Sequence, residues 1–190
     1  MGLFFKGANR LYSYRIARRL GKCGPKVQID YPARIECPWA LHVGERVWIR
    51  EHAWLNCQDH DRGGPRIVIG DGTYVGRFVH INAYSSVVIE PSVLISDRVF
   101  ISDVHHQSVD DDVPIINQGA TCPKPVLLKS GCWIGVGAAI MPGVTIGRNA
   151  VVWANAVVTR DVPDNMVARG IPAAVFPKTS KNRPVVETTV

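Results

Sequence analysis

The sequence predicts an all-β fold in which short strands wind into a solenoid, and three observations lead to this prediction. Aliphatic residues recur every six positions, a second series of small residues runs four positions behind them, and glycines follow many of the aliphatic positions. An α-helix repeats about every 3.6 residues, so it cannot give a period of six. The chain has 190 residues, of which 46% are hydrophobic, and this is enough for one domain with a buried core.

The six-residue period is clearest between residues 130 and 158. The large aliphatic series is Ile134, Ile140, Ile146, Val152 and Val158, and the small series is Ala138, Val144, Ala150 and Ala156. Looser versions reach back to about residue 27, with steps of eight between Ile35 and Val43 and between Ile81 and Ile89. If each hexad forms one strand and then turns a corner, equivalent strands stack in successive coils. The pattern therefore predicts a parallel β-helix.

Glycines are expected at the corners of such a coil, because a missing side chain is useful where successive coils approach closely. Those that directly follow the large aliphatic series are Gly44, Gly70, Gly76, Gly135 and Gly147. Outward positions hold Asp, Asn, Arg and Pro, which suits exposed turns.

The first 26 residues form a basic arm with seven Lys or Arg and no Asp or Glu. Apolar residues stand at intervals of four, and arginines oppose them: the two sets are Phe4, Ala8, Tyr12, Ile16 and Leu20, and Arg10, Arg15, Arg18 and Arg19. This spacing predicts an amphipathic helix. It docks on the domain or on a neighbouring subunit, or it rests on a membrane surface through residues 1–22. Nucleic acid is not expected as a partner, because the arm lacks the aromatic residues and motifs of a binding module.

The cysteines do not indicate a disulfide framework or a structural zinc site. There are five of them, without a CxxC pair or other paired spacing. Basic residues interrupt every apolar run in the opening stretch, so neither a signal peptide nor a transmembrane helix is expected there. We therefore expect a cytoplasmic protein, either free or peripheral to the inner face of the membrane. No bound metal is expected.

Two interruptions of the repeat are the expected places for function, since a rigid solenoid wall leaves chemistry to its loops. The first, residues 58–66, is short and polar. The second, residues 102–126, is too long for a corner and begins close to His105 and His106. Histidine titrates near neutral pH, so it suits the role of a general base.

Residues 127–176, LLKSGCWIGVGAAIMPGVTIGRNAVVWANAVVTRDVPDNMVARGIPAAVF, carry a family resemblance through "WIG", "PGVTIG", "VVTRDVP" and "G-x-P-A". The chain resembles the hexapeptide-repeat acyltransferases, and within them the sugar O-acetyltransferases of the maltose and galactoside type and of polysaccharide biosynthesis. The resemblance implies a left-handed coil, a homotrimer, and acetyl-CoA as co-substrate in a groove between subunits. The expected organisation is a basic arm at 1–25, an acyltransferase domain at 26–176 and a tail at 177–190.

The resemblance also implies which residues act on the acceptor. Alignment with the family places His106 at the position of the general base. Some members read D-H-x-H, which corresponds here to Asp103, Val104, His105 and His106, so Val104 replaces a histidine. Asp103, His105 and Asn82 are the expected acceptor-side residues. The triplet Asp110 to Asp112 is interpreted as solvated loop charge.

For the donor, the resemblance implies backbone amides near Val136, Gly137 and Ala154 that hold the pantetheine and stabilise the oxyanion. Thr159, Arg160 and Arg169 are expected near the nucleotide end, with Lys178 a further nearby cation. Ala174 and Ile171 depart from the family pattern, as does Trp153, which either stacks on the adenine or packs between coils.

The function that follows is acetyl-CoA-dependent O-acetylation of a small or lipid-linked sugar acceptor, by direct attack with His106 as base. One alternative is N-acetylation of an amino-sugar nucleotide or of a xenobiotic, and another is a non-catalytic scaffold. A zinc hydratase on the same coil needs an HxxxxH pair, and the sequence has none.

Overall fold

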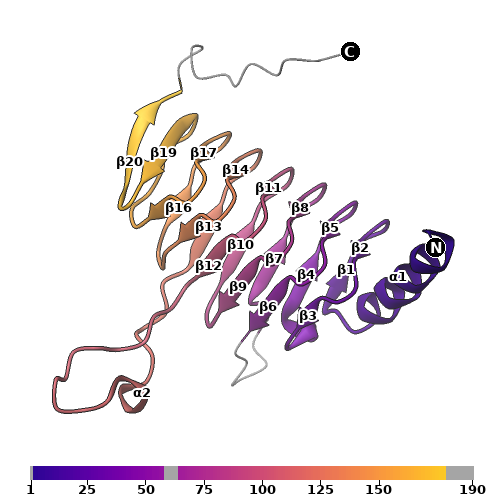
Figure 1. The fold of residues 1–190 in the computed structure, drawn as a ribbon, viewed down its shortest axis with the longest axis horizontal. Helices are drawn as coiled ribbons and strands as arrows, with labels where there is room; N and C mark the ends of the chain where they lie inside the picture. Colours follow the sequence, from indigo (N-terminus) through magenta and orange to yellow (C-terminus); the bar gives the residue numbers. More distant parts are fainter. Residues whose placement is uncertain (1, 58–63, 179–190) are drawn as a thin grey trace.

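The computed structural model describes residues 2–57 and 64–178, which wind into a coil with three flat sides (Figure 1). Each side is one sheet, and the chain visits the three sheets in turn. The first sheet contains β1 (Lys22–Cys23), β4 (Leu41–Val43), β7 (Ile67–Ile69), β10 (Val87–Ile89), β13 (Val126–Leu128) and β16 (Thr145–Ile146). The second contains β2 (Gln28–Ile29), β5 (Trp48–Ile49), β8 (Tyr74–Val75), β11 (Leu94–Ile95), β14 (Trp133–Ile134), β17 (Val151–Val152), β19 (Met166–Gly170) and β20 (Ala173–Pro177). The third contains β3 (Arg34–Ile35), β6 (Trp54–Cys57), β9 (His80–Ala83), β12 (Phe100–Ser102), β15 (Ala139–Ile140) and β18 (Val157–Val158).

The register of the sheets confirms the predicted parallel β-helix. Ile89 pairs with Ile69 on one side and with Leu128 on the other, and Leu128 pairs with Ile146. The large aliphatic series and the small series both point inward, and every member named above for residues 130–158 is at most 2% exposed. Burying such a side chain contributes about 1.5–3 kcal/mol, so the interior stacks are the main source of stability.

The corners explain both the glycines and the two steps of eight residues. An added Cβ at Gly135 would lie 2.6 Å from the amide nitrogen of Ala154, so only glycine fits between those coils. The step between Ile35 and Val43 contains the 3₁₀ helix η1 (Pro38–Ala40). The step between Ile81 and Ile89 is a three-residue corner, 84–86, between β9 and β10.

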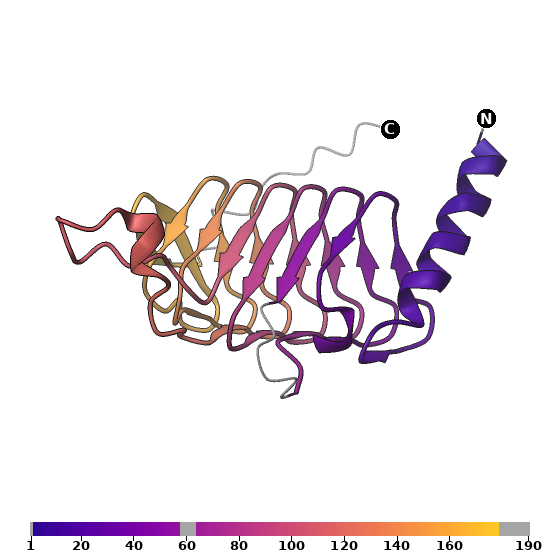
Figure 2. The same ribbon diagram turned by 90° about the horizontal axis from the view of Figure 1, so that it is seen from below.

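Helix α1 (Gly2–Ala17) docks on the N-terminal end of the coil and projects from it (Figure 2). Tyr12, Ile16 and Leu20 pack against the core, as the apolar stripe predicted; the side chains of Phe4 and Ala8 lie outside the described residues. The Ile29 amide donates to Ser13 Oγ at 2.5 Å, and the Tyr12 hydroxyl donates to the Ala33 carbonyl at 2.5 Å. Docking on the domain is therefore the arrangement in this chain.

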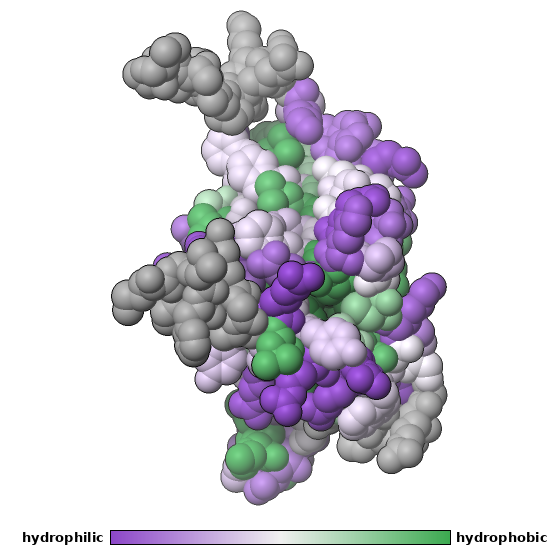
Figure 3. Space-filling model, turned by 90° about the vertical axis from the view of Figure 1, so that its right-hand side faces the viewer, coloured by the Kyte–Doolittle hydropathy of each residue, from purple (hydrophilic) through white to green (hydrophobic). Residues whose placement is uncertain are grey.

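The face of α1 turned away from the coil is basic. Arg10, Arg15, Arg18 and Arg19 are exposed, and Leu11 and Tyr14 are each 59% exposed beside them. Figure 3 looks onto this end of the molecule, where hydrophilic side chains predominate and smaller hydrophobic areas lie among them. Within residues 2–57 and 64–178, no helix combines the length and apolar character needed to cross a bilayer.

The predicted long loop leaves the coil after β12 and returns at β13, standing away from it as an arm (Figure 1). A single turn of helix, α2 (Ile115–Gln118), lies in it. We call residues 103–125 the arm. Most of the other predicted interruption, 58–66, lies outside the described residues. The coil begins with β1 and ends with the antiparallel pair β19–β20.

Candidate active site

A ladder of polar side chains crosses the outer face of the third sheet. Asn56, Asn82 and Ser102 stand in register on β6, β9 and β12. Asn56 Nδ2 donates to Asn82 Oδ1 at 2.9 Å, and Asn82 Nδ2 donates to Ser102 Oγ at 3.5 Å. Ser102 Oγ in turn donates to the Val104 carbonyl at 2.8 Å. The ladder therefore connects the wall of the coil to the root of the arm.

The arm carries the two candidate histidines on a short ribbon. The Thr121 amide donates to the His105 carbonyl at 2.8 Å, and the His105 amide donates to Thr121 Oγ1 at 3.1 Å. His106 forms an antiparallel bridge with Ala120. Both imidazoles are exposed. The structure thus brings Asn82, through Ser102, to the base of the ribbon that holds His105 and His106.

Asp103, expected beside the acceptor, is fully buried instead. Its carboxylate accepts hydrogen bonds from the amides of Tyr84, Ser85 and Ser86 at 2.9, 2.7 and 2.8 Å. The three donors satisfy both carboxylate oxygens, and no part of the side chain faces solvent. Asp103 therefore supports the site from inside the coil.

Sequence reasoning missed Asn56 and Ser102. Both are outward residues whose meaning depends on which strand lies next to which, and Asn56 is 26 residues from its partner Asn82. Aligning the predicted coils and comparing the outward-facing residues of neighbouring strands would have found them, because strand register puts equivalent positions side by side.

His80 lies on the same face but belongs to the wall. Its ring stacks on Trp54 with centroids 4.3 Å apart and meets the edge of Phe100 at 5.4 Å. Burial lowers the pKa of His80 below its ordinary value, which favours the neutral imidazole. It therefore serves as a third aromatic ring in this stack.

The corner between the second and third sheets changes character along the coil. The second residue after the strand is Glu51, Arg77 and Asp97 in three successive coils, then Val136 and Ala154 in the next two. Arg77 Nε bonds Glu51 Oε1 at 2.5 Å, and Asp97 Oδ1 accepts from the Arg77 amide at 2.8 Å. Ala154 has no carboxylate with which to cap Val136 in the same way. The later coils thus leave this corner apolar and open, with Val136 44% exposed.

The predicted donor amides are not equivalent. The Gly137 amide donates to the Asp97 carbonyl at 3.0 Å, which is the regular bond between coils, so the protein itself occupies it. The corresponding bond in the next coil runs from Asn155 to the Val136 carbonyl at 2.9 Å. In the described residues no such bond is found from the amides of Val136 and Ala154. The amides of Val136 and Ala154 thus differ from that of Gly137, which bonds the preceding coil.

Cations and aromatic rings gather at the C-terminal end of the coil. The Arg169 guanidinium lies 4.2 Å from the centroid of Phe176 and 5.4 Å from that of Trp153. Trp153 stays 42% exposed, so packing does not cover its ring. Thr159 and Arg160 are exposed after β18, and Lys178 Nζ donates to the Asn149 carbonyl at 3.1 Å.

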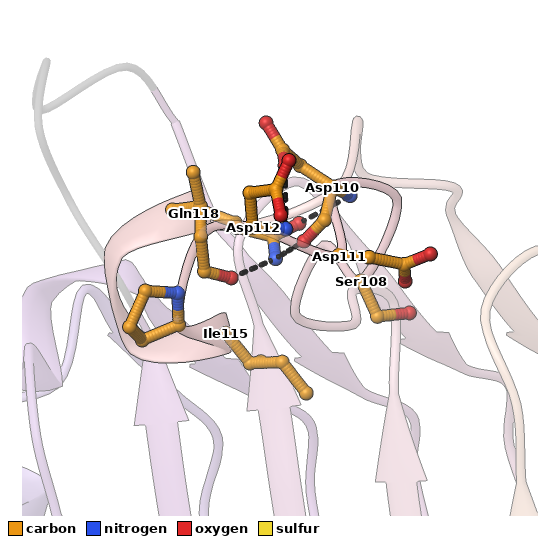
Figure 4. A pocket seen from close by; sticks show the side chains of 8 residues that line it. Ser108, Asp110, Asp111, Asp112, Ile115 and Gln118 are labelled. Carbon is orange, nitrogen blue, oxygen red and sulfur yellow. Dashed lines mark hydrogen bonds between the residues drawn. The ribbon is translucent and has the colours of Figure 1, made fainter.

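A hollow of about 480 Å³ lies at the tip of the arm, not at its root (Figure 4). Asp110, Asp111 and Asp112 line it together with Gln118, and they are exposed. Asp110 Oδ1 accepts from the Asp112 amide at 3.0 Å, and Gln118 Nε2 donates to the Asp110 carbonyl at 2.7 Å. These contacts shape the tip, in agreement with the interpretation of the triplet as solvated loop charge.

The cysteines do not supply a nucleophile at this site. Cys132 is a member of the interior series, and burial raises its pKa to about 12, so its thiol stays protonated at neutral pH. Cys122 is exposed on the arm. Histidine is therefore the group best suited to accept a proton here.

Known proteins share both the repeat and the coil. Residues 125–160 match the family model described as bacterial transferase hexapeptide (six repeats). A probable acetyltransferase of Mycobacterium tuberculosis is 36% identical over 80% of this chain, which spans 45% of that protein. The galactoside O-acetyltransferase of Escherichia coli K12 is 32% identical over 77% of this chain and 71% of its own length. A putative lipopolysaccharide biosynthesis O-acetyltransferase, WbbJ of the same strain, is 33% identical over 79% and 78%.

Two solved structures resemble the coil. A hexapeptide-repeat acetyltransferase of Vibrio cholerae O1 biovar eltor, in complex with acetyl coenzyme A, is 25% identical with a TM-score of 0.58 and covers 88% of this chain and 76% of its own. AntD, an N-acyltransferase from Bacillus cereus, is 19% identical with a TM-score of 0.75 and covers 88% and 90%. The chain belongs to the hexapeptide-repeat acyltransferase family, and its coil is the left-handed parallel β-helix that the resemblance implied.

Proposed function

We propose that the protein is an acetyl-CoA-dependent O-acetyltransferase whose acceptor is a sugar or a precursor of a glycan or polysaccharide. The observation that carries this proposal is the polar ladder at the root of the histidine arm. Asn56 and Asn82, both half-buried on the outer face, offer side-chain amides that suit the hydroxyls of a sugar, while Ser102, only 1% exposed, bonds Asn82 at the root of the arm. The relatives named as O-acetyltransferases support the same acceptor class.

His106 is the proposed general base. It takes the proton from the acceptor hydroxyl as that oxygen attacks the thioester carbonyl of acetyl-CoA. The tetrahedral intermediate then collapses, the carbon–sulfur bond breaks, and the thiolate receives the proton from His106. The products are the acetyl ester and CoA, and no covalent enzyme intermediate forms. His105 is the neighbouring acceptor-side group.

The donor site is proposed at the open corner of the C-terminal coils. Val136 and Ala154 present amides there that fit the pantetheine carbonyls and the oxyanion. Thr159, Arg160 and Arg169 are exposed nearby and suit the phosphates of the nucleotide. The Vibrio cholerae acetyltransferase, solved with acetyl coenzyme A, supports this donor.

The test is thiol release from acetyl-CoA across a panel of sugars, nucleotide sugars and amines, on the wild type and on His106→Ala. Turnover with hydroxyl acceptors that collapses in the variant is the expected result. Turnover with amines alone would replace O-acetylation by N-acetylation, for which AntD offers a likeness of fold. Absence of both turnover and acetyl-CoA binding would identify a scaffold.

A homotrimer is part of the proposal, because the family resemblance implies a donor groove between subunits. Large apolar side chains on the outer face of the second sheet remain exposed in the single chain: Trp48 is 38%, Leu94 44% and Trp133 41% exposed. Neighbouring subunits would cover such a surface. The mass in solution by light scattering tests this, and a monomer would contradict it.

The exposed face of α1 is proposed to meet an anionic lipid surface on the cytoplasmic side of a membrane, close to a lipid-linked acceptor. Four arginines attract such a surface with about 1 kcal/mol each, and Leu11 and Tyr14 suit its interface. Because the opposite face holds the helix on the coil, the test is charge reversal of Arg15, Arg18 and Arg19, not deletion. Sedimentation with phosphatidylserine vesicles should be lost, and retained binding would refute the contact.

A further inference from the structure

Two irregularities of the repeat meet at one buried carboxylate. The three-residue corner at 84–86 departs from the regular repeat. In the next coil the same corner opens into the arm. Ser102 pairs with Asn82, so Asp103 follows in register with Ala83, an inward position that is fully buried. A polar group at such a position is costly unless it is hydrogen-bonded, and the Tyr84, Ser85 and Ser86 amides supply three bonds.

The backbone of Asp103 fixes both strands of the arm at its root. Its amide donates to the Asn82 carbonyl at 3.3 Å, and its carbonyl accepts from the Lys124 amide at 2.7 Å. Asp103 therefore joins the wall, the outgoing strand and the returning strand. His105 and His106 follow two and three residues later on a ribbon closed by Thr121.

We propose that Asp103 is a positioning residue, which holds the root of the arm so that His106 stays aligned with the Asn82–Ser102 pair. This inference rests on the proposed function and deepens it. Asp103 does not touch the acceptor, because its carboxylate is fully buried and bonded to backbone amides. It acts through the amides at 84–86 and through the ribbon, whose placement sets the distance between base and acceptor hydroxyl.

The test is Asp103→Asn, which replaces one acceptor oxygen by a donor and leaves at least one of the three amides without a partner. Since a misplacement of about 1 Å can cost about 100-fold, we expect kcat to fall by roughly 10- to 100-fold while both KM values stay within about twofold. The midpoint of the pH profile of kcat should not move, because the titrating base is unchanged. A raised acceptor KM with unchanged kcat would overturn the inference in favour of direct contact.

Asp71→Asn is the matched control. Asp71 Oδ1 also caps a corner amide, that of Glu45 at 2.8 Å, but at the corner between the first and second sheets and not at the corner from which the arm leaves. Its variant should keep the wild-type kcat, and an equal loss of kcat in both variants would reduce Asp103 to a general structural role. Thr121→Val, which removes only the bond to the His105 amide, provides a second variant with an intact coil. It should lower kcat by about threefold to tenfold. A wild-type kcat would contradict the claim that the ribbon positions His106.

A measurement without turnover separates this inference from the proposed function. Amide hydrogen exchange at residues 84–86 and 105–124 should be faster in Asp103→Asn than in the wild type, and unchanged in His106→Ala. Equal exchange in wild type and Asp103→Asn would overturn the positioning role. If no acceptor turns over, the proposed function fails, while the exchange result still decides whether Asp103 holds the arm.

Discussion

The two halves of the coil share one backbone geometry but differ in the side chains at the corner between the second and third sheets. In the N-terminal half, the corner between the second and third sheets is closed by charge: Arg77 bonds Glu51 and lies 3.8 Å from Asp97. In the C-terminal half, Val136 and Ala154 occupy the same corner and leave it open. The arm also leaves the coil between these halves. The difference teaches that a repeat protein can assign stability and chemistry to different coils by changing only outward residues.

The largest effect should come from the arm. His106→Ala removes the proposed base, and general-base catalysis contributes about 10²- to 10⁴-fold, so kcat should fall at least 100-fold. The melting temperature should stay unchanged because the side chain is exposed. Steady-state kinetics on the wild type, His106→Ala and His105→Ala measure this. If His105→Ala loses more activity than His106→Ala, the base has been assigned to the wrong histidine.

A carboxylate placed at the open corner should cap a backbone amide there, as Asp97 does at the closed corner. Ala154→Asp would present a carboxylate to the Val136 amide as Asp97 does to the Arg77 amide. The affinity for acetyl-CoA should fall about tenfold, because one donor amide is capped and a negative charge faces the phosphates. Calorimetric titration measures this, with Ala154→Leu as a control of similar shape that carries no acceptor. An unchanged affinity would place the donor elsewhere.

A substitution at the closed corner should change the stability of the protein but not its affinity for acetyl-CoA. Glu51→Gln weakens the ion pairs with Arg50 and Arg77. These groups are partly exposed, so the free energy of unfolding should fall by only about 0.5–1 kcal/mol. Chemical denaturation measures the loss, and acetyl-CoA affinity should remain that of the wild type. A loss of affinity would show that the two halves are not independent.

The smallest expected effect is on the pH dependence of the free energy of unfolding. Burial lowers the pKa of His80, so the unfolded chain binds the proton more readily. Its contribution to stability is complete above the unfolded pKa of about 6.5 and declines as the pH falls below that value. His80→Phe keeps an aromatic ring beside Trp54 and should flatten this dependence below about pH 6.5. Equal slopes of unfolding free energy against pH in both proteins would contradict the prediction.

The fold could be predicted from the sequence because one physical constraint repeats in every coil. Interior residues such as Ile134 and Ile140 are six apart, and each is fully buried. The docked stripe of α1 followed from the same kind of periodicity. The course of the arm, including α2, could not be predicted, because its contacts depend on which segments meet and not on a period.

The candidate site was predictable only in part. The histidines stood out because they open the longest interruption. Asn56 and Ser102 became visible only once register placed them beside Asn82. Asp103 appeared to be an acceptor-side group, and only the coil geometry reveals that its carboxylate points inward. The occupied amide of Gly137 likewise depends on the carbonyl of Asp97 in the preceding coil.

Both ends of the second sheet are covered, and this limits how molecules of this protein can associate. A stack of parallel strands ends in rows of unpaired amides and carbonyls, which invite another molecule to extend the sheet. At one end α1 lies against the first coil through Ser13 and Tyr12. At the other end the second sheet finishes with β20, which runs against β19 and breaks the parallel order. Fibre growth along the coil axis is thereby discouraged, and assembly is directed to the sides, where the exposed tryptophans lie.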